Sequence, residues 1–224
     1  MTGIKEKFDR LQQRLEAAAA RSGRSAKDVT VVAVTKGVSV QAVLEAREAG
    51  FSVFGENRVQ EALEKIPQAA AEWHMIGHLQ TNKIRSALEL FQMVQSVDSL
   101  RLAGKINEEA LVLNRVVPVL LEVNLSGQPQ RFGFKPEEIY AAVEGAAAFP
   151  QIKVQGLMGI APAGPEEAPK REAFKKLRNL FSVCKTLKQK NIEMKYLSMG
   201  MSDDFEIAVE EGSNMVRLGR VIFR

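Results

Sequence analysis

Apolar residues near the N-terminus recur at spacings of three and four along the chain. They are Ile4, Phe8, Leu11, Leu15 and Ala18. This spacing places them on one face of an amphipathic helix, and Gly23 is a natural end for that helix. The next segment, 29–36, is a mostly β-branched run that is apolar on both faces and ends at Lys36. Such a run is typical of a strand in a parallel sheet that helices cover.

The same alternation of short apolar runs and helical patterns continues to the C-terminus. Further strands are predicted at 51–54, 73–76, 91–95, 116–123, 152–157, 194–198 and 214–218. Helices are predicted at 39–49, from Glu56, from Thr81, near 99–113, from Pro136, around 166–190 and at 203–211. Eight strands, of which the first seven are each followed by a helix, favour a closed (β/α)8 barrel over an open doubly wound sheet.

The doubly wound alternative lacks its usual nucleotide-binding signature. No Gly-x-Gly-x-x-Gly follows any predicted strand, and the segment 55–57 lacks the partner glycines. We therefore predict an α/β fold, a single (β/α)8 TIM barrel with an extra N-terminal helix, and one domain that spans residues 1–224.

Charge and composition narrow the classes of partner and compartment. The net charge of +4 comes from 31 basic and 27 acidic side chains spread along the chain, which gives no basic block for nucleic acid. The one cysteine, Cys184, cannot form a disulfide within the chain. The N-terminal residues lack an apolar signal core, and no run approaches the roughly 20 apolar residues of a membrane span. We expect a cytoplasmic protein with neither nucleic acid nor a membrane as partner.

In a (β/α)8 barrel, functional side chains come from the C-terminal ends of the strands and the loops that follow. Polar residues fall at these places after several predicted strands. They are Lys36, Asn57, Arg58, His78, Gln80, Asp98, Asn124, Ser126 and the segment 198–202. The strand ends therefore predict a polar site at one mouth of the barrel.

The loop 198–202 leads into a predicted helix that Ser202 or Asp203 can cap, with Glu206 completing a capping box. Gly200 leaves room for close backbone approach, and free N–H groups at a helix start bind anions. Phosphates commonly bind TIM barrels near strands seven and eight. Strand eight adds Arg217, Gly219 and Arg220 to the same region. This loop pattern favours a phosphate pocket, and the alternative is a capped helix without a ligand.

Lys36 ends an almost wholly apolar strand. Most lysines at strand ends are simply solvated. Partial desolvation there would favour the neutral amine, which is a nucleophile for an aldehyde. In a closed barrel, strand one is adjacent to strand eight, so Lys36 lies near the predicted phosphate pocket. A small ligand that carries both an aldehyde and a phosphate would fit the two.

Other polar residues point to structure rather than to chemistry. His74 and His78 lie on a strand and its loop, so helical metal-binding geometry does not follow, and we expect no metal. Three glutamates are predicted to form a solvated helix face: Glu56, Glu61 and Glu64. Glu61 and Lys65 are read as an ordinary i,i+4 pair.

Several blocks of the chain also resemble a known family. They are 32–36, 55–61, 73–83, 96–100, 156–158 and 198–205. With these blocks the chain resembles the pyridoxal phosphate homeostasis protein family nearly from end to end. The resemblance implies the fold type III of pyridoxal 5′-phosphate (PLP) proteins, shared with the N-terminal barrel of alanine racemase.

The resemblance also implies a function and a set of cofactor-binding residues. It implies a Schiff base between PLP and Lys36, with Asn57 near the ring. It places a further set around the phosphate, namely Ser198, Gly200, Ser202, Arg217 and Gly219. The implied role is a non-catalytic carrier that buffers PLP and delivers it to apo forms of PLP enzymes. We expect a monomer, because nothing in the chain replaces the second domain of alanine racemase.

The chain departs from the family pattern at two positions, and two enzymatic alternatives stay open. Arg220 stands where the family usually has Ser or Thr, and Arg224 where it usually has Gly. A small PLP-dependent amino-acid racemase would need a second base opposite Lys36, and the chain offers only Tyr140 and Tyr196 as tyrosines. An aldolase for a phosphorylated sugar would need acid and base residues beside Lys36.

Overall fold

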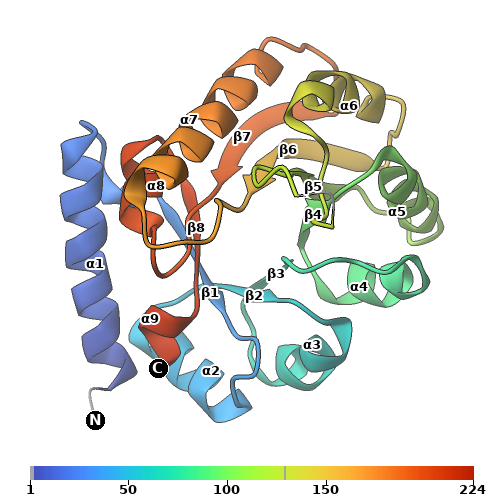
Figure 1. Ribbon diagram of the computed structural model, residues 1–224. Coiled ribbons are helices and arrows are strands. Elements are labelled where there is room, and N and C mark those ends of the chain that lie inside the picture. Colours follow the sequence, from blue (N-terminus) through green and yellow to red (C-terminus); the bar gives the residue numbers. More distant parts are fainter. Residues whose placement is uncertain (1–2, 129) are drawn as a thin grey trace.

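The computed structural model describes residues 3–128 and 130–224. Within these residues, eight parallel strands close into a barrel in chain order (Figure 1). The strands are β1 (Thr30–Val34), β2 (Val53–Glu56), β3 (Glu72–Met75), β4 (Met93–Val97), β5 (Val117–Val123), β6 (Ile152–Gly159), β7 (Ile192–Ser198) and β8 (Met215–Leu218). The barrel closes where β1 pairs with β8, with Val32 opposite Arg217. The predicted fold class is confirmed.

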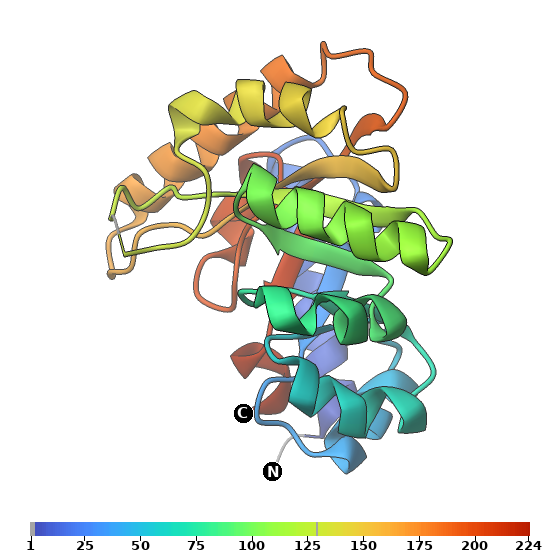
Figure 2. The same cartoon turned by 90° about the vertical axis from the view of Figure 1, so that its right-hand side faces the viewer.

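Helices surround the barrel (Figures 1 and 2). They are α1 (Ile4–Arg21), α2 (Val40–Ala49), α3 (Val59–Lys65), α4 (Ile84–Leu90), α5 (Leu100–Val112), α6 (Ile139–Ala146), α7 (Glu167–Cys184), α8 (Phe205–Glu210) and α9 (Arg220–Phe223). The extra helix α1 contacts α2, α8 and α9. In the described residues, no helix is both long and apolar enough to cross a membrane.

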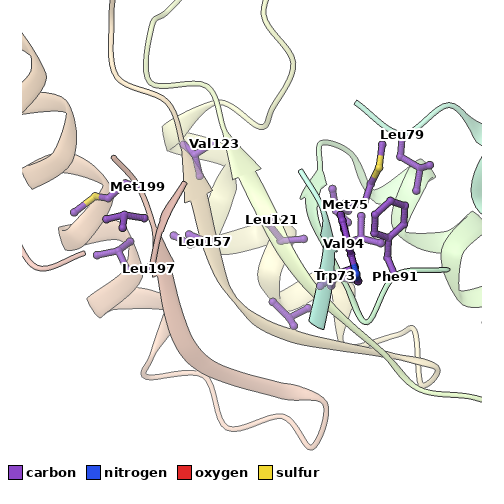
Figure 3. Packing of buried hydrophobic residues seen from close by; sticks show 14 of the residues in the cluster. Trp73, Met75, Leu79, Phe91, Val94, Leu121, Val123, Leu157, Leu197 and Met199 are labelled. Atoms are coloured by element: carbon purple, nitrogen blue, oxygen red, sulfur yellow. The ribbon is translucent and has the colours of Figure 1, made fainter. Parts of the chain in front are cut away.

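Most strands have two largely apolar faces because both are covered, whereas β7 alternates buried residues with the exposed Glu193 and Lys195. One face fills the barrel interior, where residues from six of the strands form a small cluster: Val32, Val53, Met93, Leu120, Met158 and Met215. The other face packs against the helices, where Trp73 stacks on Phe54 with ring centroids 5.1 Å apart. Figure 3 shows part of this outer layer, including Trp73, Phe91 and Leu121. Two-sided burial is the reason that these strands lack polar alternation.

Strand β1 is shorter than predicted and ends at Val34, two residues before Lys36. Gly37 has φ +67°, a left-handed conformation that glycine adopts without steric cost. The N–H of Val38 donates to the carbonyl oxygen of Thr35 at 2.9 Å, which closes a turn. Lys36 therefore lies on a turn beyond the strand.

Two predicted helix boundaries were wrong. The helix predicted from Glu56 begins at Val59, and Glu56 is instead the last residue of β2. The helix predicted over 166–190 ends at Cys184. The N–H groups of Thr186 and Leu187 donate to the carbonyl oxygens of Val183 and Cys184, and these bonds tighten the last turn.

The short helix α9 was not predicted. Its four residues are too few to give a recognisable helical period, although Ile222 is buried and anchors it. The helix follows β8 directly, with Gly219 at its N-cap position. It thereby covers the edge of the site near β1 and β8 (Figure 1).

Candidate functional site

A pocket of about 530 Å³ opens at the C-terminal ends of β1, β2 and β8 beside α9. Five of the seven residues predicted to bind a cofactor line it: Lys36, Asn57, Ser202, Arg217 and Gly219. Apolar walls come from Val34, Ile76 and Ile160, and Arg220 and Arg224 line the outer part. We call this cavity the Lys36 pocket. The barrel closure thus brings strands one and eight together as predicted.

Two predicted residues do not line the Lys36 pocket. Ser198 is fully buried inside the barrel. Gly200 has φ +98°, and a Cβ at this position would lie 2.6 Å from the Cβ of Ala208. The glycine is therefore required for α8 to pack closely on the loop.

Lys36 is exposed, so the expectation of partial desolvation was wrong. The reason is the early end of β1, which puts the lysine on the turn. The backbone on both sides of it is fixed by side chains. The Nζ of Lys65 donates to the Thr35 carbonyl oxygen at 2.7 Å, and the N–H of Gly37 donates to Oε2 of Glu61 at 2.9 Å.

The carboxylate of Glu56 lies in a buried charged cluster under this turn. Its Oε1 accepts bonds from Nζ of Lys65 at 2.5 Å and from Oγ1 of Thr35 at 2.6 Å. Glu56 is fully buried and the Lys65 side chain is 6% exposed, so the prediction of a solvated face was wrong for Glu56. We call Glu56, Glu61 and Lys65 the Glu56 cluster. Sequence reasoning missed it because Glu56 was assigned to the helix instead of the strand end.

Glu61 is less buried than the other two members. Its bond from the Gly37 N–H holds the pKa of its carboxyl below the usual value, and the Lys65 ammonium lowers this pKa further against the opposing effect of burial. The carboxylate form is therefore the form that the turn stabilises.

The other end of the Lys36 pocket is formed by Ser202 and the start of α9. The Ser202 hydroxyl accepts bonds from the N–H groups of Gly219 at 3.3 Å and Val221 at 3.4 Å. Ser202 thus binds the start of α9, and it does not cap α8, whose N-cap residue is Asp204. The nearby arginines add positive charge at this end of the pocket, which favours an anion.

The predicted capping box of α8 does not form. Glu206 instead pairs with Arg14 of α1 at 3.0 Å. Asp203 forms an ion pair with Arg220, and both side chains are exposed. The charge of Arg220 at the pocket edge is therefore shared with Asp203.

Arg217 begins a chain of hydrogen bonds through the barrel interior. Its guanidinium donates to the Ser198 hydroxyl at 2.7 Å, and this hydroxyl donates to Oε1 of Gln95 at 2.6 Å. Nε2 of Gln95 bonds Nδ1 of His74 at 2.8 Å, and Nε2 of His74 bonds Glu72 at 2.9 Å. The NH2 group of Gln95 can only donate, so Nδ1 of His74 accepts, and Nε2 of His74 is then the donor to Glu72. Each residue from Arg217 to His74 therefore donates to the next residue of the chain. We call these residues the Arg217 chain.

Arg217 reaches the Lys36 pocket from below. A further guanidinium bond goes to the carbonyl oxygen of Gly159 at 2.9 Å. Burial lowers the pKa of Arg217 to about 10, against the opposing effects of Glu122 and Asp204. Its partners within hydrogen-bond distance are neutral, and the carboxyl groups of Glu122 and Asp204 lie near enough to act on its charge.

A second cavity of about 360 Å³ adjoins the Lys36 pocket and shares Asn57, Ile76 and Ile160 with it. Its walls include Glu122 of β5, whose pKa burial raises to about 7. His78 also lines it, bonded to Asp98 at 3.0 Å. The sequence signal for Glu122 is a lone carboxylate in the apolar strand 117–123. Within the described residues, no group of three or more His, Cys, Asp or Glu side chains is arranged as metal ligands.

Comparison with known proteins places this geometry in a family. The family model described as "Alanine racemase, N-terminal domain" matches residues 7–224. The pyridoxal phosphate homeostasis protein of Vibrio cholerae is 36% identical over 230 residues, which cover 100% of this chain and 96% of the relative. The chain belongs to the pyridoxal phosphate homeostasis protein family. The relative of the same name from Aquifex aeolicus is 37% identical and covers 97% of this chain and 96% of its own length.

Solved structures support the same assignment to the pyridoxal phosphate homeostasis protein family. PipY of Synechococcus elongatus, described as having PLP bound, has a TM-score of 0.85 at 32% identity and covers 99% of this chain and 100% of its own. An unknown protein from Bifidobacterium adolescentis has a TM-score of 0.91 at 34% identity, covering 98% and 94%. Alanine racemase of Clostridium difficile, at 18% identity and a TM-score of 0.72, shares the fold.

Proposed function

We propose that this chain binds PLP in the Lys36 pocket, holds it as a Schiff base on Lys36, and serves in intracellular PLP homeostasis by buffering and delivering the cofactor. The observation that carries the proposal is a single pocket that joins an exposed lysine to the Ser202–Gly219 end of the site. Membership of the family and the PLP-bound description of PipY support it.

The residues of the pocket fit a phosphorylated aldehyde at both of its ends. The Ser202 hydroxyl, held by the N–H groups of Gly219 and Val221, is a polar group at one end of the pocket that a phosphate could contact. Arg217, Arg220 and Arg224 add positive charge to the lining. The apolar walls suit a flat heteroaromatic ring between these ends. We place the phosphate at the start of α9 and the aldehyde at Lys36.

PLP supplies the aldehyde to this reaction. Bound PLP would offer this aldehyde to the neutral amine of Lys36, and a C=N bond would form while the carbonyl oxygen leaves as water with both amine hydrogens. Lys36 is exposed in the structure, which favours access of water to its side chain and so a reversible reaction. Reversible capture is the property that a carrier needs.

The racemase alternative is not supported by the two tyrosines named as candidates for its second base. Tyr140 lies on α6 and is 40% exposed. Tyr196 lies on β7 and lines a different cavity, together with Glu72 and His74. Neither tyrosine lines the Lys36 pocket. An aldolase would use a free carboxylate beside Lys36, whereas Glu61 is already bonded to Gly37 and Lys65.

The proposed function is tested by loading the purified protein with PLP and mixing it with an apo PLP-dependent enzyme. We expect recovery of the acceptor's activity, a long-wavelength absorbance band in the loaded protein, and a monomer in light scattering. Lys36→Ala is expected to lack the band. Sustained racemisation of alanine above the Lys36→Ala control would contradict the carrier role.

A further inference from the structure

Both neighbours of Lys36 in the chain are bonded to the Glu56 cluster. Lys65 holds the carbonyl oxygen of Thr35, and Glu61 holds the N–H of Gly37. The cluster therefore fixes the backbone immediately before and after the lysine. Among the described residues, Nζ of Lys36 itself makes no hydrogen bond with the protein.

The same cluster also holds a second residue of the Lys36 pocket. Oε2 of Glu56 accepts the N–H of Asn57 at 3.1 Å. Asn57 follows Glu56 at the end of β2 and lines the pocket next to Lys36. One carboxylate thus links two backbone segments that face the same ligand space.

The donors of Lys65 are fully used within this arrangement. Its Nζ bonds the Thr35 carbonyl oxygen at 2.7 Å, Glu56 at 2.5 Å and Glu61 at 3.4 Å. An ammonium has three N–H donors, so three acceptors satisfy it. Lys65 is thereby occupied as a structural cation and does not compete with Lys36 as a nucleophile.

A buried ion pair is often no better for stability than apolar side chains of the same volume. A geometric role accounts for the placement of this one, because its bonds go to the turn that carries Lys36. Functional side chains need support of this kind from neighbouring groups to stay in a productive position.

We propose that Glu56, Glu61 and Lys65 are positioning residues that hold the Thr35–Gly37 turn so that Lys36 faces the pocket, and thereby set how tightly the protein captures aldehydes such as PLP. This inference rests on the proposed function. It assigns the cluster no contact with PLP itself. Because Glu61 bonds the Lys36 turn and not Asn57, the effect of losing Glu61 is expected only for ligands that bond covalently to Lys36.

Glu61→Ala tests the proposal, because Glu61 is the least buried member and its loss leaves the Glu56–Lys65 pair intact. The matched control is Glu64→Ala on the same helix, which removes the same charge from an exposed side chain. Each variant is titrated with PLP and with 4′-deoxypyridoxine 5′-phosphate, which lacks the aldehyde. Thermal unfolding of each variant shows that it is folded.

For Glu61→Ala we expect PLP affinity to fall about three- to tenfold, the range for ordering one long side chain on binding. Affinity for the aldehyde-free analogue is expected to stay within about twofold, and Glu64→Ala to behave as wild type. Glu61→Gln keeps an oxygen acceptor for Gly37 and should restore most of the PLP affinity. In a Lys36→Ala background, Glu61→Ala should change nothing further.

Several results would overturn the proposal. One is unchanged PLP affinity in Glu61→Ala, and another is an equal loss for PLP and for the analogue, which would indicate general damage to the pocket. A further loss in the Lys36→Ala background would also contradict it. Failure of the proposed function itself has a different signature, because wild type and Lys36→Ala would then bind PLP alike.

Discussion

The Glu56 cluster and the Arg217 chain both lie beneath the Lys36 pocket. Each contains a buried cationic side chain, Lys65 or Arg217, and the two are stabilised in different ways. The Glu56 cluster lies on the outer face of the barrel. Gly55 faces the barrel interior, next to Val32 and Ile76. Successive strand residues point to opposite faces, so Glu56 points outward, toward α3. There the Lys65 ammonium is matched by carboxylates. The Arg217 chain lies inside the barrel, where the guanidinium bonds only neutral oxygens.

This difference separates two kinds of support. In the Glu56 cluster, carboxylates balance the charge of Lys65 and the cluster fixes the backbone, so its benefit is geometric. The Arg217 chain leaves a positive charge under the pocket, so its benefit is electrostatic attraction for an anionic ligand. Removing Lys65 from its buried pair with Glu56 should therefore affect mainly folding, whereas removing Arg217 should affect mainly ligand retention.

The largest expected effect is on stability, in Lys65→Met. The substitution leaves the fully buried Glu56 carboxylate without its cation, which typically costs about 3–5 kcal/mol. The double variant Glu56→Gln with Lys65→Met should recover most of this loss, because no buried charge remains. Urea denaturation measures both. A single variant as stable as wild type would show that the pair is not buried in solution.

The next effect is on cofactor retention, in Arg217→Ala. Loss of the guanidinium removes positive charge at the pocket, and charge-assisted hydrogen bonds are worth about 1.5–3 kcal/mol, or roughly 10- to 100-fold in affinity. Ser198→Ala is the control, since it alters the chain but keeps the charge. Equilibrium dialysis with PLP measures retention. Unchanged affinity in Arg217→Ala would place this residue outside the binding interactions.

A smaller effect concerns the pH dependence of stability through Glu122. Burial raises its pKa to about 7 from an ordinary value near 4.5, so the folded state favours the protonated carboxyl. Stability from this group is full below pH 4.5 and is lost as the pH rises through 7. Glu122→Gln should remove about 1–2 kcal/mol of this pH dependence between pH 5 and 8. If the Tm of wild type and of Glu122→Gln changed with pH in the same way, Glu122 would not be the group with the raised pKa.

The smallest effect is expected for Arg220→Thr, which places a residue common in the family at this position. Arg220 pairs with Asp203 on the surface, where such pairs contribute about 0–1 kcal/mol. We expect a change in Tm of no more than a few degrees, measured by calorimetry at low and high salt. A large salt-independent loss would show that Arg220 has a buried role.

The barrel could be predicted from sequence because its signals are local. Apolar runs and helical spacings repeat in the order that a (β/α)8 fold requires, and Lys36, Asn57, Ser202, Arg217 and Gly219 were correctly expected at one mouth of the barrel. That the whole chain forms one domain and a monomer stays a prediction.

What sequence reasoning missed depends on differences of a few residues in where elements begin and end. Glu56 changes from a solvated helix residue to a buried strand residue when the helix starts at Val59. The partners of His74 and Ser198 could not be found, because strands that are apolar on both faces do not indicate which side chains point inward. Those contacts join residues 103 positions apart, as between Ser198 and Gln95.

The central claim is that PLP bonds covalently to Lys36. It is tested most directly by borohydride reduction of the PLP-loaded protein, followed by peptide mapping of the adduct in wild type and in Lys36→Ala. The account predicts one major adduct, on Lys36, that is absent from the variant. An adduct on another lysine, or equal labelling of the two proteins, would contradict it.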